Sequence, residues 1–333
     1  MRAVVARTLG PPETMALEDL PSRPLAPGEL RVAVHFAGVS FVDVLTATGG
    51  YQVKPPTPFT PGSELSGIVS EVGPDAKGFK VGDRVSAASF GSAFGEEAIV
   101  TAASAALVPP GLALAEAALI RTNYLTACYA LKARAQVQPG EIVLVLGAAG
   151  GVGVACIQVA VAYGAKVIAS ASSEAKRQLA LSCGASHAID SGAPDWRDQV
   201  KALTGGRGAD VVADPVGGDQ TERAFRSLAW NGRHLVIGFA AGEIPRLPTN
   251  LALLKGASLM GVDLRQVAPN EPQLMQAMSV EVARLAAAGI ARPPIAKIYP
   301  LDEFADAMRE VASGAPAGRI VLKTPAADQS NQD

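Results

Sequence analysis

The sequence predicts an α/β protein in which a doubly wound parallel sheet is joined to a second, β-rich domain. Three observations predict this fold class. A strand, a glycine-rich turn, a helix and a second strand follow one another between residues 141 and 170. Strands and helices then alternate up to residue 264, which is typical of a parallel Rossmann sheet with helices on both faces. About the first 110 residues contain short strand-like runs separated by Pro and Gly instead.

The glycine-rich turn follows a short apolar run at 142–146, which is typical of a strand buried on both faces. Apolar residues recur at helical spacing after the turn, up to Gly164. Such a turn lets the backbone approach a pyrophosphate, and the first amides of the helix can donate to phosphate. The pattern departs from the usual fingerprint because Ala149 replaces one glycine. We interpret it as a dinucleotide-binding turn.

The end of the second strand, 166–170, indicates which dinucleotide binds. NAD sites usually have a carboxylate there for the ribose 2′-hydroxyl, whereas a 2′-phosphate needs hydroxyl or cationic groups. Ser172 can donate to a phosphate, and Lys176 and Arg177 can supply charge. Alternatively, these cations are solvated residues of the next helix, partly neutralised by Glu174. The pattern favours NADPH, with NADH the less favoured cofactor.

The alternation continues with four more strands and two helices between them. We expect strands at 188–190, 210–214, 234–238 and 258–264, and helices at 196–204 and 220–229. Residues 214–218 and 238–242 follow strands, at the edge where parallel sheets bind ligands. Both segments can therefore line the same crevice as the glycine turn.

The flanking regions have a different character. We expect strands at 1–6, 30–37, 65–72, 84–87 and 97–100, forming an irregular β-barrel or rolled sheet. An alanine- and leucine-rich helical stretch at 112–136 bridges the domains. Near the C-terminus we expect helices at 271–288 and 301–313 and strands at 296–299 and 319–323. The polar tail, 326–333, is expected to be disordered.

Bulk composition excludes several classes of function. The 333 residues, 49% of them apolar, can fill two cores. A net charge of −2 offers no basic field for nucleic acid or an anionic membrane. No apolar run reaches about 18 residues, so we expect a soluble, cytoplasmic protein. The cysteines and histidines form no zinc-like cluster, and we interpret them as structural: Cys128, Cys156, Cys183, His35, His187 and His234.

Several motifs together indicate a family. GAAGGVG, DVVADPVGG, GRHLVIGFAAGEIPRLPTNLALLKGASLMGVDL and PLDEFADAMREVASGAPAGRIVLK resemble the zinc-independent quinone oxidoreductase (zeta-crystallin-like) branch of the medium-chain dehydrogenase/reductase superfamily. The resemblance covers nearly the whole chain. It implies a GroES-like catalytic domain at 1–122, a Rossmann domain at 123–267 and a segment at 268–325 that completes the catalytic domain. It also implies a homodimer joined through the last Rossmann strand, Ser258 to Leu264.

The resemblance also bears on metal content. Zinc-dependent relatives place a Cys near the start of the helix that begins here at Ser40, and a Gly-His-Glu where this chain has Gly62-Ser63-Glu64. Serine is a poor zinc ligand, and the four-cysteine loop of those relatives is absent. We therefore expect no metal, and no Lewis acid to stabilise an alkoxide.

Without zinc, the expected substrate is one that accepts hydride readily, namely a quinone or an activated alkene. The resemblance implies a pocket at Ser40, Leu45 and Tyr51. Quinone reductases often carry Asn at the first of these positions, and some carry Tyr at the second. Tyr51 also matches the Gly-x-Tyr pattern of enoyl-thioester reductases, where the tyrosine donates a proton or binds the carbonyl. Alternatively, Tyr51 packs on the barrel rim, and Asp43 is a helix N-terminal carboxylate.

The resemblance further implies a set of cofactor contacts. The turn would hold the pyrophosphate, Thr126 would lie near the phosphates or the nicotinamide ribose, and Lys176 would meet the 2′-phosphate with Ser172. Gly238, Phe239 and Ala240 would flank the nicotinamide, with Val216 beneath it. The turn residues concerned are Ala149, Gly150, Gly151, Val152 and Gly153.

Three functions follow from this reading. The favoured one is an NADPH-dependent, zinc-independent quinone oxidoreductase. The second is an NADPH-dependent reductase of the C=C bond of α,β-unsaturated carbonyl or enoyl compounds. The third is a nucleotide-binding structural or RNA-binding module, against which the balanced charge argues.

Overall fold

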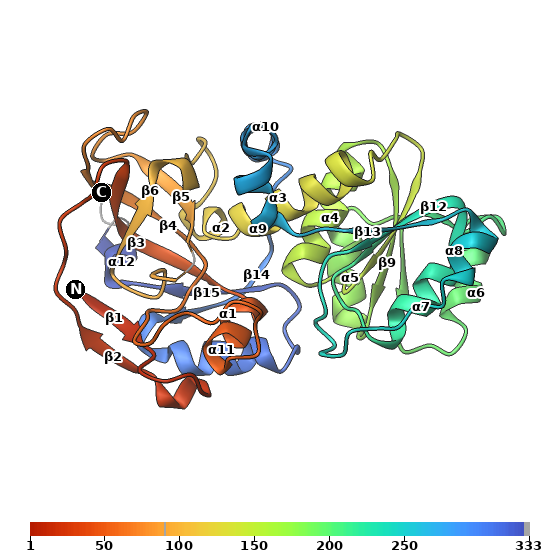
Figure 1. The fold of residues 1–333 in the computed structure, drawn as a ribbon, viewed down its shortest axis with the longest axis horizontal. Helices are drawn as coiled ribbons and strands as arrows, with labels where there is room; N and C mark the ends of the chain where they lie inside the picture. The colour runs from red at the N-terminus through yellow and green to blue at the C-terminus, as the bar shows by residue number, and fades with distance from the viewer. Residues whose placement is uncertain (90, 330–333) are drawn as a thin grey trace. The chain divides into compact units, whose positions relative to one another are not determined.

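The computed structural model of the chain describes residues 1–89 and 91–329 (Figure 1). It divides into two compact units. One contains residues 1–122 together with the chain from Arg292 onward, and the other contains Asn123–Ala291. Each unit buries its own apolar cluster.

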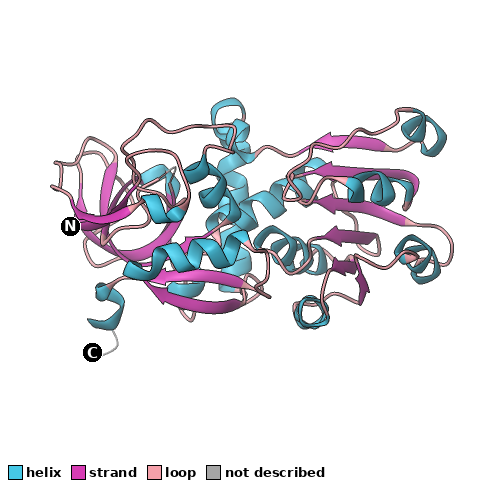
Figure 2. Cartoon of the chain, turned by 90° about the horizontal axis from the view of Figure 1, so that it is seen from below, coloured by secondary structure: helices cyan, strands magenta, loops and turns pink. Residues whose placement is uncertain are grey.

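The second unit is built on a six-stranded parallel sheet with strand order β10-β9-β8-β11-β12-β13. In chain order this is 3-2-1-4-5-6, the order of a doubly wound Rossmann sheet, so the predicted fold class is confirmed. Figure 2 shows its strands running in one direction. The strands are β8 Ile142–Leu146, β9 Lys166–Ala171, β10 His187–Asp190, β11 Ala209–Asp214, β12 Leu228–Val236 and β13 Ser258–Gly261.

Helices connect these strands: α4 Gly151–Ala162, α5 Glu174–Ser182, α6 Trp196–Leu203, α7 Asp219–Arg226 and α8 Asn250–Lys255. Trp196 and Phe225 are fully buried and pack with Leu144 of β8 in one core cluster. Large aromatic side chains at these positions bury enough apolar surface to hold the helices on the sheet.

The first unit is the β-rich domain. A seven-stranded sheet contains β3 Glu29–Val39, β4 Glu64–Val72, β5 Arg84–Ala88, β6 Glu97–Thr101, β7 Ala105–Leu107, β14 Ile295–Pro300 and β15 Arg319–Lys323, and a small sheet contains β1 Arg2–Val5 and β2 Ala16–Asp19. The long strand β3 pairs with β4, β6 and β15. The C-terminal strands therefore complete a sheet begun by the N-terminal part of the chain. α1 Phe41–Thr48 and α11 Phe304–Ala312 pack against each other.

The structure corrects two expectations about helices. The stretch 112–136 is not one helix but α2 Leu114–Ala117, α3 Arg121–Cys128 and a π-helical segment Tyr129–Arg134. The first break, at 118–120, lies just before the chain passes from one unit to the other, between Thr122 and Asn123. The expected strand 258–264 ends at Gly261, because the Asp263 side chain accepts a hydrogen bond from the Arg265 amide and begins α9, Leu264–Asn270.

The C-terminal region requires two further corrections. Residues 268–291 belong to the Rossmann unit, because Glu281 of α10, Pro272–Ala287, bonds to Tyr163 and pairs with Lys132 in that unit. The expected disordered tail is wrong for 326–329, where α12, Pro325–Gln329, buries Ala327; residues 330–333 lie outside the described part. Within the described residues, the helices are too short or too polar to cross a membrane.

Candidate functional site

The glycine turn between β8 and α4 leaves helix amides available to a ligand. Gly147 has a φ of +56° and begins the turn, and Gly150 is the N-cap of α4. The amides of Gly151, Val152 and Gly153 belong to the first turn of α4 and therefore have no partner within the helix. Gly150 has no side chain to cap them, so they remain available to a ligand. Such a helix end suits a phosphate group.

Close packing explains why the third glycine is needed. A Cβ on Gly153 would lie 2.2 Å from the carbonyl oxygen of Gly147, which no real side chain tolerates. Ala148 and Ala149, within the turn itself, are buried. The helix therefore approaches the end of β8 as closely as the backbone allows.

The segments that follow β11 and β12 lie together beside this turn. The amide of Ala240 donates to the carbonyl of Pro215 at 3.2 Å, and the amide of Ala241 donates to that of Val216 at 2.8 Å. A Cβ on Gly147 would lie 2.9 Å from a methyl group of Val216. The structure thus brings the turn, residues 214–218 and residues 238–242 to one edge of the sheet, the edge at which doubly wound sheets bind ligands.

Asp214, the last residue of β11, holds the first of these segments. Its side chain is 2% exposed and accepts hydrogen bonds from the amides of Val216 and Gly217 at 2.9 and 2.8 Å. It also accepts from the Thr221 hydroxyl at 2.7 Å and lies 3.0 Å from Nε2 of His234. Burial alone would raise the pKa of Asp214, but the His234 and backbone hydrogen bonds outweigh it and lower the pKa.

Sequence reasoning missed this pairing, because it treated His234 as structural without a neighbour. The signal was present: both residues are polar and lie in buried apolar strands, and these strands are adjacent in a 3-2-1-4-5-6 sheet.

The end of β9 places Ser172 and Lys176 close in the chain at the start of α5. Ser172 is exposed, and the neighbouring Ser173 caps the helix by accepting from the Lys176 amide at 3.4 Å. Arg177 differs from the sequence expectation. It pairs with Glu174 at 3.0 Å and with Asp190 at 3.2 Å, so two carboxylates already compensate its charge.

Thr126 is buried on α3. This helix is tied to α4 by the hydroxyl of Tyr124, which donates to Gln158. Thr126 therefore lies on a helix braced against the one that the glycine turn begins.

In the β-rich unit, Ser40 and Asp43 form a capping box at the start of α1. Asp43 Oδ2 accepts from the Ser40 amide at 2.8 Å and from its hydroxyl at 2.7 Å. Burial raises the pKa of Asp43 to about 6, against the lowering effect of hydrogen bonds from Ser40 and Ser63. Ser40, where this helix begins, and Ser63, which stands at the expected position of a zinc-ligand histidine, therefore both hydrogen-bond to this buried carboxyl group. This agrees with interpreting Asp43 as a helix N-terminal residue.

Glu64, the next residue after Ser63, forms a buried ion pair. Its carboxylate accepts from Arg319 at 2.8 Å and from the amide of Thr122 at 3.3 Å. The Arg319 guanidinium also donates to the carbonyl of Val39 at 3.3 Å. The pair joins β4, β15 and the end of β3, so we interpret it as structural.

Leu45 lies near the middle of α1, and Tyr51 follows its C-terminal end. The amides of Gly50 and Tyr51 both donate to the carbonyl of Leu45, and the two side chains are partly exposed. The backbone of Tyr51 is thus joined to that of Leu45, whereas the Ser40 side chain is bonded to Asp43.

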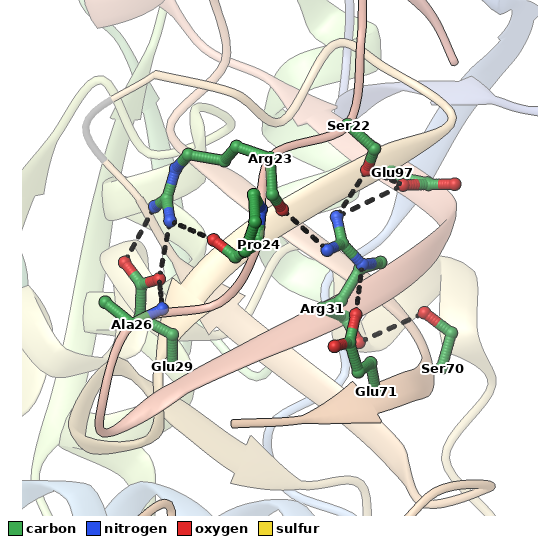
Figure 3. A network of polar contacts seen from close by, with 9 residues as sticks. All are labelled: Ser22, Arg23, Pro24, Ala26, Glu29, Arg31, Ser70, Glu71 and Glu97. Atoms are coloured by element: carbon green, nitrogen blue, oxygen red, sulfur yellow. Dashed lines mark hydrogen bonds and ion pairs between the residues drawn. The ribbon is translucent and has the colours of Figure 1, made fainter. Parts of the chain in front are cut away.

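A third polar cluster in this unit is centred on Arg31 and Arg23 and is drawn in Figure 3. Its contacts indicate a structural role. The Arg31 guanidinium donates to Glu71 at 2.8 Å, to the Ser22 hydroxyl and to the carbonyl of Arg23 at 2.7 Å. Arg23 in turn forms a bidentate pair with Glu29. The cluster fastens the segment 22–29 to β3 and β4.

Comparisons with known proteins bear on both units. Residues 26–130 match the family described as alcohol dehydrogenase GroES-like domain, and residues 151–280 match the family described as zinc-binding dehydrogenase. Quinone oxidoreductase-like protein 2 of Mus musculus is 39% identical over 322 residues, which cover 96% of this chain and 91% of the mouse protein.

Solved structures are similar to this chain over nearly its whole length. The mycobacterial protein Rv1454c, solved in complex with NADPH, has a TM-score of 0.89 at 29% identity and covers 97% of this chain and 99% of its own. The CurK enoyl reductase has a TM-score of 0.88 at 26% identity, with coverage of 97% and 99%.

Proposed function

The chain belongs to the quinone oxidoreductase-like branch of the medium-chain dehydrogenase/reductase superfamily, and on this basis we propose that it transfers hydride from NADPH to a quinone without zinc. The observation that carries the proposal is the uncapped start of α4, with residues 214–218 and 238–242 beside it. When bound, the nicotinamide supplies the hydride. The protein binds the phosphates with backbone amides, orients the ring and excludes water.

The choice of NADPH rests on the end of β9. Ser172 and Lys176 can meet a 2′-phosphate there, and the carboxylates of this strand end are already bonded, Glu174 to Arg177 and Gln178 and Asp190 to Arg177. The similarity to a protein solved with NADPH supports this choice.

Replacing Lys176 with alanine tests the cofactor preference. Loss of one charge-assisted contact costs about 1.5 to 3 kcal/mol, so we expect NADPH to bind about 10 to 100 times more weakly, with little change for NADH. Lys201→Ala is the control, because it removes an equal charge from the last turn of α6 without leaving a carboxylate beside the site unpaired, so it should change the NADPH/NADH ratio much less. Fluorescence titration with both nucleotides measures the ratio. Equal weakening of NADPH and NADH by Lys176→Ala would contradict the assignment.

The absence of zinc chemistry is proposed from the residues at the expected ligand positions. Ser63 stands where zinc-dependent relatives have a histidine, no Cys lies near the start of α1, and both Ser40 and Ser63 hydrogen-bond to Asp43. Within residues 1–89 and 91–329, no group of three or more His, Cys, Asp or Glu side chains could hold a metal.

The activity itself is tested with purified, chelator-treated protein. NADPH consumption is measured in parallel with an ortho-quinone and with a 2-enoyl compound. We expect rapid turnover of the quinone alone. Turnover that chelation abolishes and zinc restores would contradict the zinc-free reading.

Reduction of an activated C=C bond is the alternative, favoured by the position of Tyr51. Its side chain is partly exposed and its backbone is fastened to the end of α1, as a proton donor or carbonyl-binding group requires. Similarity to an enoyl reductase supports this alternative. In that case Tyr51→Phe should slow turnover of the 2-enoyl compound; unchanged turnover would leave Tyr51 as a packing residue.

We further propose a homodimer joined through β13. This strand is the edge of the sheet, and exposed apolar side chains occur on it and on the neighbouring elements: Trp230, Ile244, Leu253, Leu254 and Leu259. An exposed apolar edge strand is a template for pairing with another chain.

A further inference from the structure

We propose that His234 is a positioning residue which, through Asp214, holds residues 215–218 in the shape that the nicotinamide end of the cofactor requires. The inference rests on the proposed NADPH function. It concerns two buried polar side chains that the proposed hydride transfer does not itself use.

The geometry places the two oxygens of Asp214 in different roles. His234 pairs with Val212 in the register of β12 and β11, and Asp214 pairs with Val236, so the two side chains share one face of the sheet. Oδ2 contacts the two side chains that hold the carboxylate in place: it lies 3.0 Å from His234 Nε2 and accepts from the Thr221 hydroxyl at 2.7 Å. Oδ1 accepts the amides of residues 216 and 217 at 2.9 and 2.8 Å. The carboxylate is thus anchored on one side and holds the loop on the other.

The loop has little freedom to adjust if this anchor moves. Gly217 and Gly218 have φ values of +72° and +57°, and a Cβ on Gly217 would lie 2.9 Å from the Phe239 ring. Val216 is packed against Gly147 of the phosphate-binding turn. A rotation of the Asp214 carboxylate would therefore move the amide of Val216 and, with it, one wall of the crevice.

The protonation of His234 follows from its partner. The carboxylate of Asp214 accepts, so His234 carries a proton on Nε2. Its Nδ1 is buried and has no hydrogen-bond partner in the described part of the chain, while the ring stacks on Phe225 with centroids 5.8 Å apart. An apolar side chain would fill this space without leaving a buried nitrogen unpaired. The contact with Asp214 is the interaction that distinguishes histidine from such a side chain.

A matched pair of variants tests this role. His234→Gln keeps an amide donor near the position of Nε2, and His234→Met has a similar length and volume without a donor. We expect His234→Gln to bind NADPH within about threefold of the wild type, and His234→Met to bind about tenfold or more weakly, as loss of a buried charge-assisted hydrogen bond predicts. Hydrogen exchange without nucleotide should be faster at the amides of Val216 and Gly217 in His234→Met only.

The control is Thr204→Val in the same unit. Its buried hydroxyl accepts from the Gly208 amide at 2.9 Å, at the opposite end of β11. This variant should lower the Tm without changing NADPH affinity or exchange at residues 216 and 217.

Three outcomes would overturn the inference or its basis. If His234→Met keeps wild-type affinity and exchange, His234 does not position the loop. If Thr204→Val weakens NADPH binding as much as His234→Met does, general destabilisation explains the effect and the role of His234 is refuted. If the wild type binds neither NADPH nor NADH, the proposed function itself fails, and the cofactor role of His234 fails with it.

Discussion

Asp43 is a buried carboxyl group whose ionisation should make stability depend on pH. Its pKa is raised from 3.8 to about 6 in the folded protein, chiefly by burial. Between these values the folded state keeps a proton that the unfolded state releases. The contribution of Asp43 to the free energy of unfolding is therefore greatest below about pH 4 and falls as pH rises to about 6, by up to about 3 kcal/mol.

Replacing Asp43 with asparagine should remove this dependence. The amide oxygen can still accept from the Ser40 amide and hydroxyl, but no charge is buried. We expect Asp43→Asn to gain stability relative to the wild type between pH 4 and pH 7, measured by urea unfolding at each pH. If the free energy of unfolding changes with pH in the same way in both proteins, hydrogen bonds stabilise the ionised Asp43 carboxylate fully in the fold, and the prediction is wrong.

At the scale of elements, the Glu64–Arg319 pair should hold β4 and β15 together. The two side chains are 1% and 8% exposed. Removing one partner leaves a buried charge unpaired, which costs about 3 to 5 kcal/mol, whereas replacing both can be much less costly. We expect Arg319→Met to destabilise strongly and Arg319→Met combined with Glu64→Met to recover part of the loss in urea unfolding. A double variant less stable than Arg319→Met alone would contradict this account.

Secondary structure in the Rossmann unit is the part that local sequence predicted best. The strands at β8, β9 and β11 and the helices between them form close to their expected positions, because short apolar runs and glycine punctuation act over a few residues. The 112–136 stretch shows the limit of this reasoning. Its composition favours helix throughout, but the helix is interrupted at 118–120, where Leu119 and Ile120 are buried between α2 and α3.

At the scale of the whole molecule, the proposed dimer depends on the free edge of β13. We expect the wild type to be a dimer in light scattering and Leu259→Lys to shift it towards monomer, because Leu259 is 51% exposed on that edge and a charge there opposes pairing. Leu181→Lys is the control, since Leu181 is an exposed leucine on α5. A monomeric wild type would contradict the proposal.

Local sequence patterns were enough to predict the fold class, the parallel alternation and the location of the glycine turn before α4, because these depend on glycine spacing and on the period of apolar residues. The tertiary structure decided which distant residues meet. It paired Asp214 with His234, brought Ser63 to Asp43 and Arg319 to Glu64, and assigned residues 268–291 to the Rossmann unit. These contacts join residues separated by as many as 255 positions. They follow from strand order and from how helices and loops pack on the sheets, which a local pattern of residues does not encode.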